Sequence, residues 1–159
     1  MIDWMDAGLW DRVARLAIAY VLAVPIAWNR EREARGAGLR TFPLVAIASC
    51  GLMLISERVS LMDEGNHGRI LQGLVTGVGF IGAGAILKGS QTIHGTATAA
   101  SIWNVAIAGA AVGYRLYEVA AVLAIFNLIT LQFLTPLKEV ARRPENNQPK
   151  DEAADSEEV

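Results

Sequence analysis

The motif most suggestive of chemistry in this sequence is a glycine-rich string, Gly77-Val-Gly-Phe-Ile-Gly82. It has the G-x-G-x-x-G spacing of a dinucleotide-binding loop, in which glycines let the backbone approach a pyrophosphate. That function also requires a preceding strand, a following helix and an acidic residue about 20 residues further on. Here the glycines lie within an apolar run, and the segment 96–101 contains no acid. The sequence therefore argues against nucleotide binding.

The sequence also contains no identifiable set of residues suited to nucleophilic catalysis. Such catalysis needs a nucleophile and a base within hydrogen-bond reach, with a third group to orient the base. Ser49, Ser60 and Ser90 have no convincing partner, and His67 and His94 lie at opposite ends of an apolar segment. We therefore expect that the chain is not an enzyme.

Asp63 and Glu64 are the candidates for a metal site. Mg²⁺ prefers oxygen ligands and keeps several of its waters, so neighbouring carboxylates can hold it in hydrated form. However, transport of a divalent ion calls for polar ligands within the membrane. The acids within the apolar segments described below are Asp11, Glu57 and Glu118, and all three lie near the ends of their segments. We expect no cofactor, with Mg²⁺ as a possible ligand.

The elements that must position these residues are five apolar segments. They lie near residues 9–28, 42–61, 70–87, 96–113 and 116–134. A bilayer core needs about 20 apolar helical residues to span it. The second segment is apolar only to Ile55, so it crosses only if the helix continues past Glu57 and Arg58. The sequence predicts an all-α, polytopic transmembrane bundle of about five helices over residues 1–143.

The charge distribution predicts an orientation. Four arginines lie between Arg30 and Arg40, and short basic loops face the cytoplasm. Five crossings then place the Lys88 loop and the stretch 138–143 on the same side, with the N-terminus outside. Residues 144–159 carry six acids and one base, and a segment of this composition cannot bury enough apolar surface to fold. We expect it to be a disordered cytoplasmic tail.

Glycines at helical spacing mark two faces that could pack against other helices. Gly73, Gly77 and Gly84 share one face, and Gly109 and Gly113 form a second G-x-x-x-G pair. Small residues let helix backbones approach closely in lipid. The surplus glycines of the third segment could instead permit a break that exposes carbonyls to a polar pathway. The positions predicted for packing or for a pathway are Gly73, Gly77, Gly79, Gly82, Gly84, Asn104, Gly109 and Gly113.

Asn104 is the residue we expect to make a polar contact inside the bundle, and hydrogen bonding between helices is the alternative to a ligand there. Arg30, Glu31, Arg40 and Thr98 form a second polar group, expected on the cytoplasmic side. They either belong to a solvated loop or fold against the start of the 96–113 helix. A helix N-terminus with arginines suits an anion such as a phosphate or a lipid headgroup.

The sequence resembles the membrane domain of the MgtC/SapB family, bacterial inner-membrane proteins linked to low-magnesium growth and virulence. The resemblance rests on residues 29–33, 37–41, 69–70, 77–84 and 95–103, taken in order. It departs from the family pattern at Asn66, where an acid is usual, at Gly73, where glutamine is usual, and in the string Gly95-Thr-Ala-Thr-Ala-Ala100. Many members also have a cytoplasmic C-terminal domain, which we do not expect here.

The resemblance implies one of two functions. The first is a regulatory or interaction protein linked to magnesium homeostasis, which docks on another membrane protein complex. Small-residue packing faces and the absence of any expected buried charge favour it. The second is a Mg²⁺ transporter or channel component, favoured by the surplus glycines. In either case we expect a homo-oligomer in the lipid bilayer of the bacterial inner membrane, with no nucleic-acid partner.

Overall fold

The computed structural model describes residues 3–33, 37–60, 66–88 and 93–134, and these fold almost entirely into helices. The helices are α1 (Asp3–Glu33), α2 (Thr41–Ser60), α3 (Asn66–Gly84), α4 (Thr96–Gly113) and α5 (Tyr117–Ile129). A π-helical turn, η1 (Thr130–Leu134), continues α5. Two short antiparallel strands, β1 (Leu87–Lys88) and β2 (Ile93–His94), connect α3 to α4. The predicted all-α bundle of five helices is therefore confirmed.

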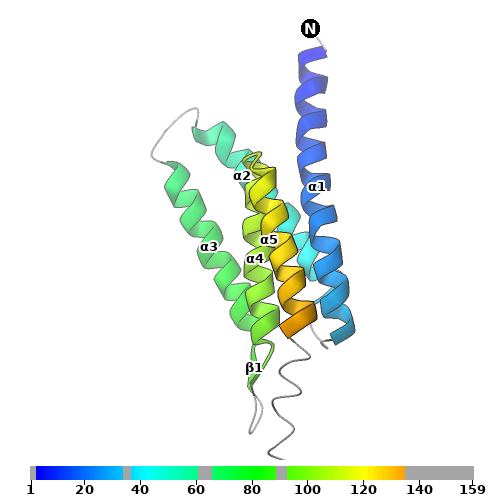
Figure 1. Cartoon of the computed structure of the whole chain (residues 1–159). Coiled ribbons are helices and arrows are strands. Elements are labelled where there is room, and N and C mark those ends of the chain that lie inside the picture. Colours follow the sequence, from blue (N-terminus) through cyan, green and yellow to red (C-terminus); the bar gives the residue numbers. More distant parts are fainter. Residues whose placement is uncertain (1–2, 34–36, 61–65, 89–92, 135–159) are drawn as a thin grey trace, which may run out of the picture.

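Successive helices run in opposite directions along a common axis (Figure 1). The N-terminus of α1 lies at one end of the bundle, and the end of α5 lies at the other, together with the β1–β2 hairpin. α4 is the central helix, since it contacts α1, α2, α3 and α5. α1 and α3 form the outer edges in this view, so each of them leaves much of its surface uncovered.

Three helical segments in the described part of the chain are long and apolar enough to cross a bilayer. They are Thr41–Val59, Thr96–Gly113 and Tyr117–Leu134, with mean hydropathies of 1.6, 1.3 and 1.7. The second predicted segment does continue as a helix past Glu57 and Arg58. α1 and α3 run alongside these three spans. The chain is a multi-pass membrane protein.

The tightest packing in the bundle is between α2 and α4, at the two glycines of the second G-x-x-x-G pair. A Cβ added to Gly109 would lie 2.9 Å from the Cα of Ala46 and would overlap the Ala46 carbonyl oxygen. One added to Gly113 would lie 2.6 Å from the Cβ of Met53 and 3.0 Å from the carbonyl oxygen of Cys50. Any side chain at these glycines would force α2 and α4 apart.

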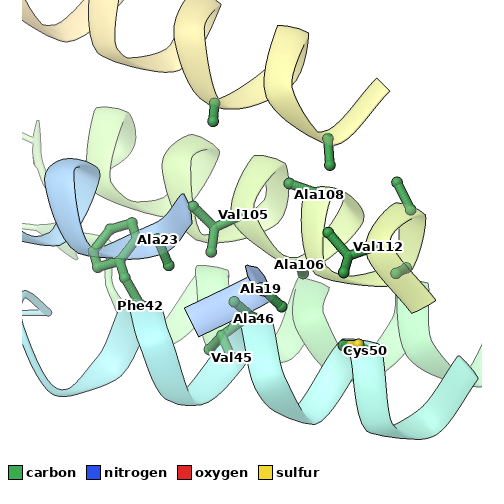
Figure 2. Packing of buried hydrophobic residues seen from close by; sticks show 14 of the residues in the cluster. Ala19, Ala23, Phe42, Val45, Ala46, Cys50, Val105, Ala106, Ala108 and Val112 are labelled. Carbon is green, nitrogen blue, oxygen red and sulfur yellow. The ribbon is translucent and has the colours of Figure 1, made fainter. Parts of the chain in front are cut away.

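Small side chains make up most of the core around this crossing (Figure 2). Ala19 and Ala23 of α1, Ala46 of α2 and Ala106 of α4 are each at most 2% exposed, and Phe42 closes one end of the layer. In lipid, helices gain little from hydrophobic burial against one another, and close backbone approach supplies van der Waals contact instead. The alanines therefore allow α1, α2 and α4 to pack as one unit.

The turn into α4 depends on glycine for a different reason. Gly95 precedes the first residue of α4 with φ 87°, in the left-handed region that disfavours side chains. A Cβ there would also overlap the Ala85 carbonyl oxygen. The end of α3 and the start of α4 therefore lie close together, on either side of the hairpin.

The two G-x-x-x-G pairs predict opposite responses to the same substitution. Gly109→Ala should destabilise the protein by about 1–3 kcal/mol, because the added methyl group overpacks the α2–α4 contact. Gly77→Ala should leave stability unchanged or raise it by up to about 1 kcal/mol, because its Cβ meets nothing and alanine favours a helix. Thermal unfolding of each variant in the same detergent measures both effects. Equal destabilisation by the two substitutions would contradict the assigned packing.

Candidate functional site

A buried arginine joins several elements near the N-terminal part of α1. Arg15 is 3% exposed. Its Nη1 donates to the carbonyl oxygen of Gly113 at 2.7 Å and to Oε2 of Glu57 at 3.1 Å, and its Nη2 donates to Oδ2 of Asp11 at 2.6 Å. Asp11 also accepts a 2.8 Å bond from Nη2 of Arg115. This Arg15 cluster ties α1 to α2, to the end of α4 and to the turn that follows α4.

The position of Arg15 follows from the chemistry of a helix end. The last four carbonyls of a helix have no partner within it, and they carry partial negative charge. Gly113 is the last residue of α4, so its carbonyl is one of these groups. A charged side chain is stable away from water only when it is paired and hydrogen-bonded. Arg15 satisfies the Gly113 carbonyl while Asp11 and Glu57 neutralise the guanidinium.

The Arg15 cluster also braces the turn between α4 and α5. Arg115 has φ 63°, a left-handed conformation that is uncommon for a residue with a side chain. Here it lets the backbone N–H of Leu116 reach the carbonyl of Ala111 at 2.9 Å, which closes the end of α4. The Arg115 side chain then turns back to Asp11. Helix α1 therefore contacts both the end of α4 and its turn.

The expectation that the bundle contains no buried charge is wrong, since Arg15 and Arg30 are both buried. The sequence held one signal, because Asp11 and Arg15 stand four residues apart, the spacing of an ion pair on one helix face. Their position in the first turns of an otherwise apolar segment indicates an amphipathic helix start, and this pattern does not say whether the polar face meets water or another helix. Only the folded chain shows that this face points at the end of α4.

The four polar residues predicted on the cytoplasmic side divide between buried and exposed positions. Arg30 and Thr98 are each 4% exposed. Glu31 accepts a 2.9 Å bond from the backbone N–H of Leu39, just before α2 begins. Arg40 is exposed and lines the groove described next. The described hydrogen bond of Glu31 therefore stabilises the connection between α1 and α2 and does not reach the start of α4.

A wide groove of about 600 Å³ lies between α2 and α3. Its α3 wall includes Gly73 and Gly77, and Arg40 lies at one end. A Cβ added at Gly73, Gly77, Gly79 or Gly84 would meet nothing within 4 Å. Gly82 differs, because a Cβ added there would lie 3.5 Å from the Ala99 carbonyl oxygen of α4, in ordinary van der Waals contact. The glycine face of α3 therefore stays mostly open within this chain, and α3 remains an unbroken helix.

A smaller, more polar pocket of about 200 Å³ lies between α4 and α5. Ser101 and Asn104 line it from α4, and Asn127 and Thr130 line it from α5 and η1. The Ser101 hydroxyl donates a 3.0 Å bond to Oδ1 of Asn127. Asn104 was predicted to face the bundle interior, and it lies half-buried in this pocket. Sequence alone did not show that all four residues meet.

The described residues contain no cluster of three histidine, cysteine or carboxylate side chains that could hold a metal ion. The predicted metal candidates, Asp63 and Glu64, lie outside the described residues, as do the basic stretch 138–143 and the acidic tail. Within the described ranges, the grooves hold neutral polar groups and arginine but no carboxylate.

Sequence similarity relates the chain to a known family. The model of the MgtC family matches residues 16–140, which include most of α1 and all of α2 to α5. The chain belongs to the MgtC family. In the described part of this MgtC family member, the matched region includes both grooves. Of the Arg15 cluster it includes Glu57, Gly113 and Arg115, whereas Asp11 and Arg15 precede it. No solved structure is significantly similar to the chain.

Three relatives show how much of each homologous protein this chain covers. The chain is 34% identical to protein SrpB of Synechococcus elongatus, over 87% of this chain and 80% of SrpB. It is 37% identical to the "Putative magnesium transporter YhiD" of Escherichia coli K12, over 76% of this chain and 59% of YhiD. It is 36% identical to protein MgtC of Brucella abortus, over 80% of this chain and 52% of that protein. The chain therefore spans little more than half of the last two.

Removing the Arg15 side-chain charge should destabilise this MgtC family protein. We expect Arg15→Gln to lower the free energy of unfolding by about 2–3 kcal/mol, because it weakens charged hydrogen bonds to three groups at once. Arg12→Gln is the matched control, one turn earlier on the same helix and more exposed. Denaturation in detergent should separate the two variants, and an Arg12→Gln loss as large as that of Arg15→Gln would refute the assignment.

Proposed function

We propose that this protein is a regulatory or interaction protein of the bacterial inner membrane, linked to magnesium homeostasis or adaptation to low magnesium. Its α2–α3 groove would receive a transmembrane helix of another membrane protein. The magnesium link rests on the family and on the name of the relative YhiD. The docking role rests on the groove.

The open glycine face of α3 is the observation that carries this proposal. A helix needs no glycine merely to face lipid, and each glycine weakens it by up to about 1 kcal/mol relative to alanine. Gly73 and Gly77 line a largely apolar groove of about 600 Å³, and a Cβ added to either would meet no described atom of another element within 4 Å. Small residues are the usual means of bringing two membrane helices into close contact. An incoming helix would use that space and would leave Arg40 at the groove's end free for a carboxylate.

Transport of Mg²⁺ is the second candidate function. The name of YhiD and the neutral oxygen groups of the α4–α5 pocket favour it. Mg²⁺ gives up its waters reluctantly and usually binds through carboxylates. The grooves in the described ranges offer no carboxylate. The geometry therefore supports interaction over transport.

The proposal includes an orientation and a state of assembly. The Arg30–Arg40 connection, the β1–β2 hairpin and the end of α5 lie at one end of the bundle, and by the basic character of these connections that end would face the cytoplasm. The N-terminus would then lie outside. Self-association in the bilayer is part of the same proposal, because α3 and α5 leave large apolar surfaces uncovered.

Filling the groove should abolish function without unfolding the protein. In the native host lacking the chromosomal copy, Gly77→Leu should lose growth in low magnesium, while its abundance and melting temperature stay at wild-type values. Gly68→Leu is the matched control, since it adds the same side chain to an open position on α3 outside the groove. Gly77→Ala also replaces the glycine with a stronger helix former, but it adds only a methyl group to the groove, so it should retain most of the growth. This variant therefore distinguishes the effect of filling the groove from the effect of a higher helix propensity.

A flux measurement on the purified protein distinguishes an interaction function from Mg²⁺ transport. Purified wild-type protein in liposomes should move Mg²⁺ no faster than empty vesicles, as measured with a Mg²⁺-sensitive dye inside. Flux above that background, lost in Asn104→Leu, would replace the interaction function with transport. Normal low-magnesium growth of the Gly77→Leu strain would exclude the α2–α3 groove as the docking site.

A further inference from the structure

The α2–α3 groove combines a long apolar wall with one charged group at its end. Apart from Arg40, Thr41 and Ser49, it is lined by apolar residues and glycines. Ser49 is buried, and Gly73 and Gly77 leave open space along α3. The groove therefore offers van der Waals contact along its length and a cation at one end, which is the pattern of an amphiphile with an apolar chain and an anionic head.

The groove is about as long as one leaflet of a bilayer. Thr41 is the first residue of the membrane span Thr41–Val59, and Arg40 precedes it, so this end of the groove lies at the boundary of the hydrocarbon. Leu52, the last lining residue of α2, follows Thr41 by eleven positions, or about 17 Å at 1.5 Å per residue. Half of a hydrocarbon core of about 30 Å is about 15 Å. The groove thus extends from the membrane surface to near the midplane, the depth that an acyl chain occupies.

Arg40 is the group at this boundary that can bind an anion. Its side chain is exposed and forms no ion pair within the described part of the chain. The backbone N–H groups of Thr41 and Phe42 already donate to the Gly38 carbonyl, and Pro43 has no N–H to offer. A guanidinium binds a phosphate through charge-assisted, often bidentate hydrogen bonds. The side chain of Arg40 therefore supplies the contact to a headgroup.

The charges around Arg40 favour a negatively charged lipid over a neutral one. Residues 30–40 carry four arginines and two glutamates. One of these glutamates, Glu31, already accepts a hydrogen bond from the backbone N–H of Leu39. In the orientation proposed above, this end faces the cytoplasmic leaflet, whose anionic lipids attract basic segments next to the membrane.

We infer that the α2–α3 groove binds one anionic phospholipid from the leaflet at its Arg40 end, with an acyl chain along the glycine wall of α3 and the phosphate on Arg40. The binding itself does not depend on the docking function proposed above, but its consequence rests on that function. A partner helix would use the same groove and the same arginine, so it would have to displace the lipid. The anionic lipid content of the membrane would then set how readily a partner docks.

Lipid selectivity of the purified protein tests the inference. The protein in detergent is titrated with phosphatidylglycerol or with phosphatidylcholine of the same acyl chains, and native mass spectrometry counts the bound lipids. Wild type should bind one phosphatidylglycerol about tenfold more tightly than phosphatidylcholine, because only the former has a net negative charge to pair with Arg40. Arg40→Gln should bring that ratio close to one. Arg32→Gln is the matched control and should keep it, since it removes the same charge from an exposed position on α1 at the same end of the bundle.

Filling the groove tests where the lipid lies. Gly77→Leu should weaken phosphatidylglycerol binding by about tenfold at an unchanged melting temperature, because the new side chain takes the space of the acyl chain. Gly68→Leu adds the same side chain to α3 outside the groove and should bind like wild type. Inorganic phosphate should not displace the lipid, because it cannot use the apolar wall.

Four results would overturn the inference. They are a wild type without preference for phosphatidylglycerol, equal loss of that preference in Arg40→Gln and Arg32→Gln, unchanged binding in Gly77→Leu, and displacement by inorganic phosphate. The second would indicate general attraction to a basic surface, the third a lipid site elsewhere, and the fourth a simple anion site. Normal growth of the Gly77→Leu strain in low magnesium would instead remove the docking function and leave the lipid site in place.

Discussion

The close crossing of α2 and α4 is the constraint on which the rest of the structure depends, and Arg15 secures it at one end. Gly109 and Gly113 let the two backbones meet where any side chain would separate them. The Gly113 carbonyl, left without a partner at the end of α4, then receives the Arg15 guanidinium. One glycine thus serves helix packing through its missing side chain and helix capping through its carbonyl, and it positions α1 against both helices.

The uncovered surfaces follow from this arrangement. Since α4 is central and α1, α2 and α4 pack as one unit, α3 and α5 pack against this unit, and both keep large apolar side chains exposed, such as Phe80 and Phe126. The two grooves lie where these two helices meet the central unit, and they differ in chemistry. The α2–α3 groove is apolar with glycines in its wall, whereas the α4–α5 pocket contains two asparagines. Its apolar lining suits the α2–α3 groove to a transmembrane helix of another protein.

The sequence predicted the helices well because long apolar runs bounded by charged loops leave few alternatives in a membrane. The family resemblance was equally accessible, since its strings are contiguous. The role of individual glycines was not accessible, because Gly73–Gly77 and Gly109–Gly113 have the same spacing and yet, in the described part of the chain, only the second pair packs against another helix. Arg15 was missed for a related reason. Whether a charged residue near a helix start faces water or a neighbouring helix end depends on tertiary contacts that no local pattern contains.

The contact between Arg15 and Gly113 is the most direct test of this account, and solid-state NMR in lipid bilayers measures it. Protein labelled with ¹³C at glycine carbonyls and ¹⁵N at arginine guanidinium groups is compared with the Arg15→Gln variant by rotational-echo double resonance. The account predicts a strong carbonyl–guanidinium coupling in the wild-type protein that disappears in the variant, while Arg12→Gln retains it. A wild-type spectrum without that coupling, or one that Arg15→Gln leaves unchanged, would contradict the anchoring of α1 on the end of α4.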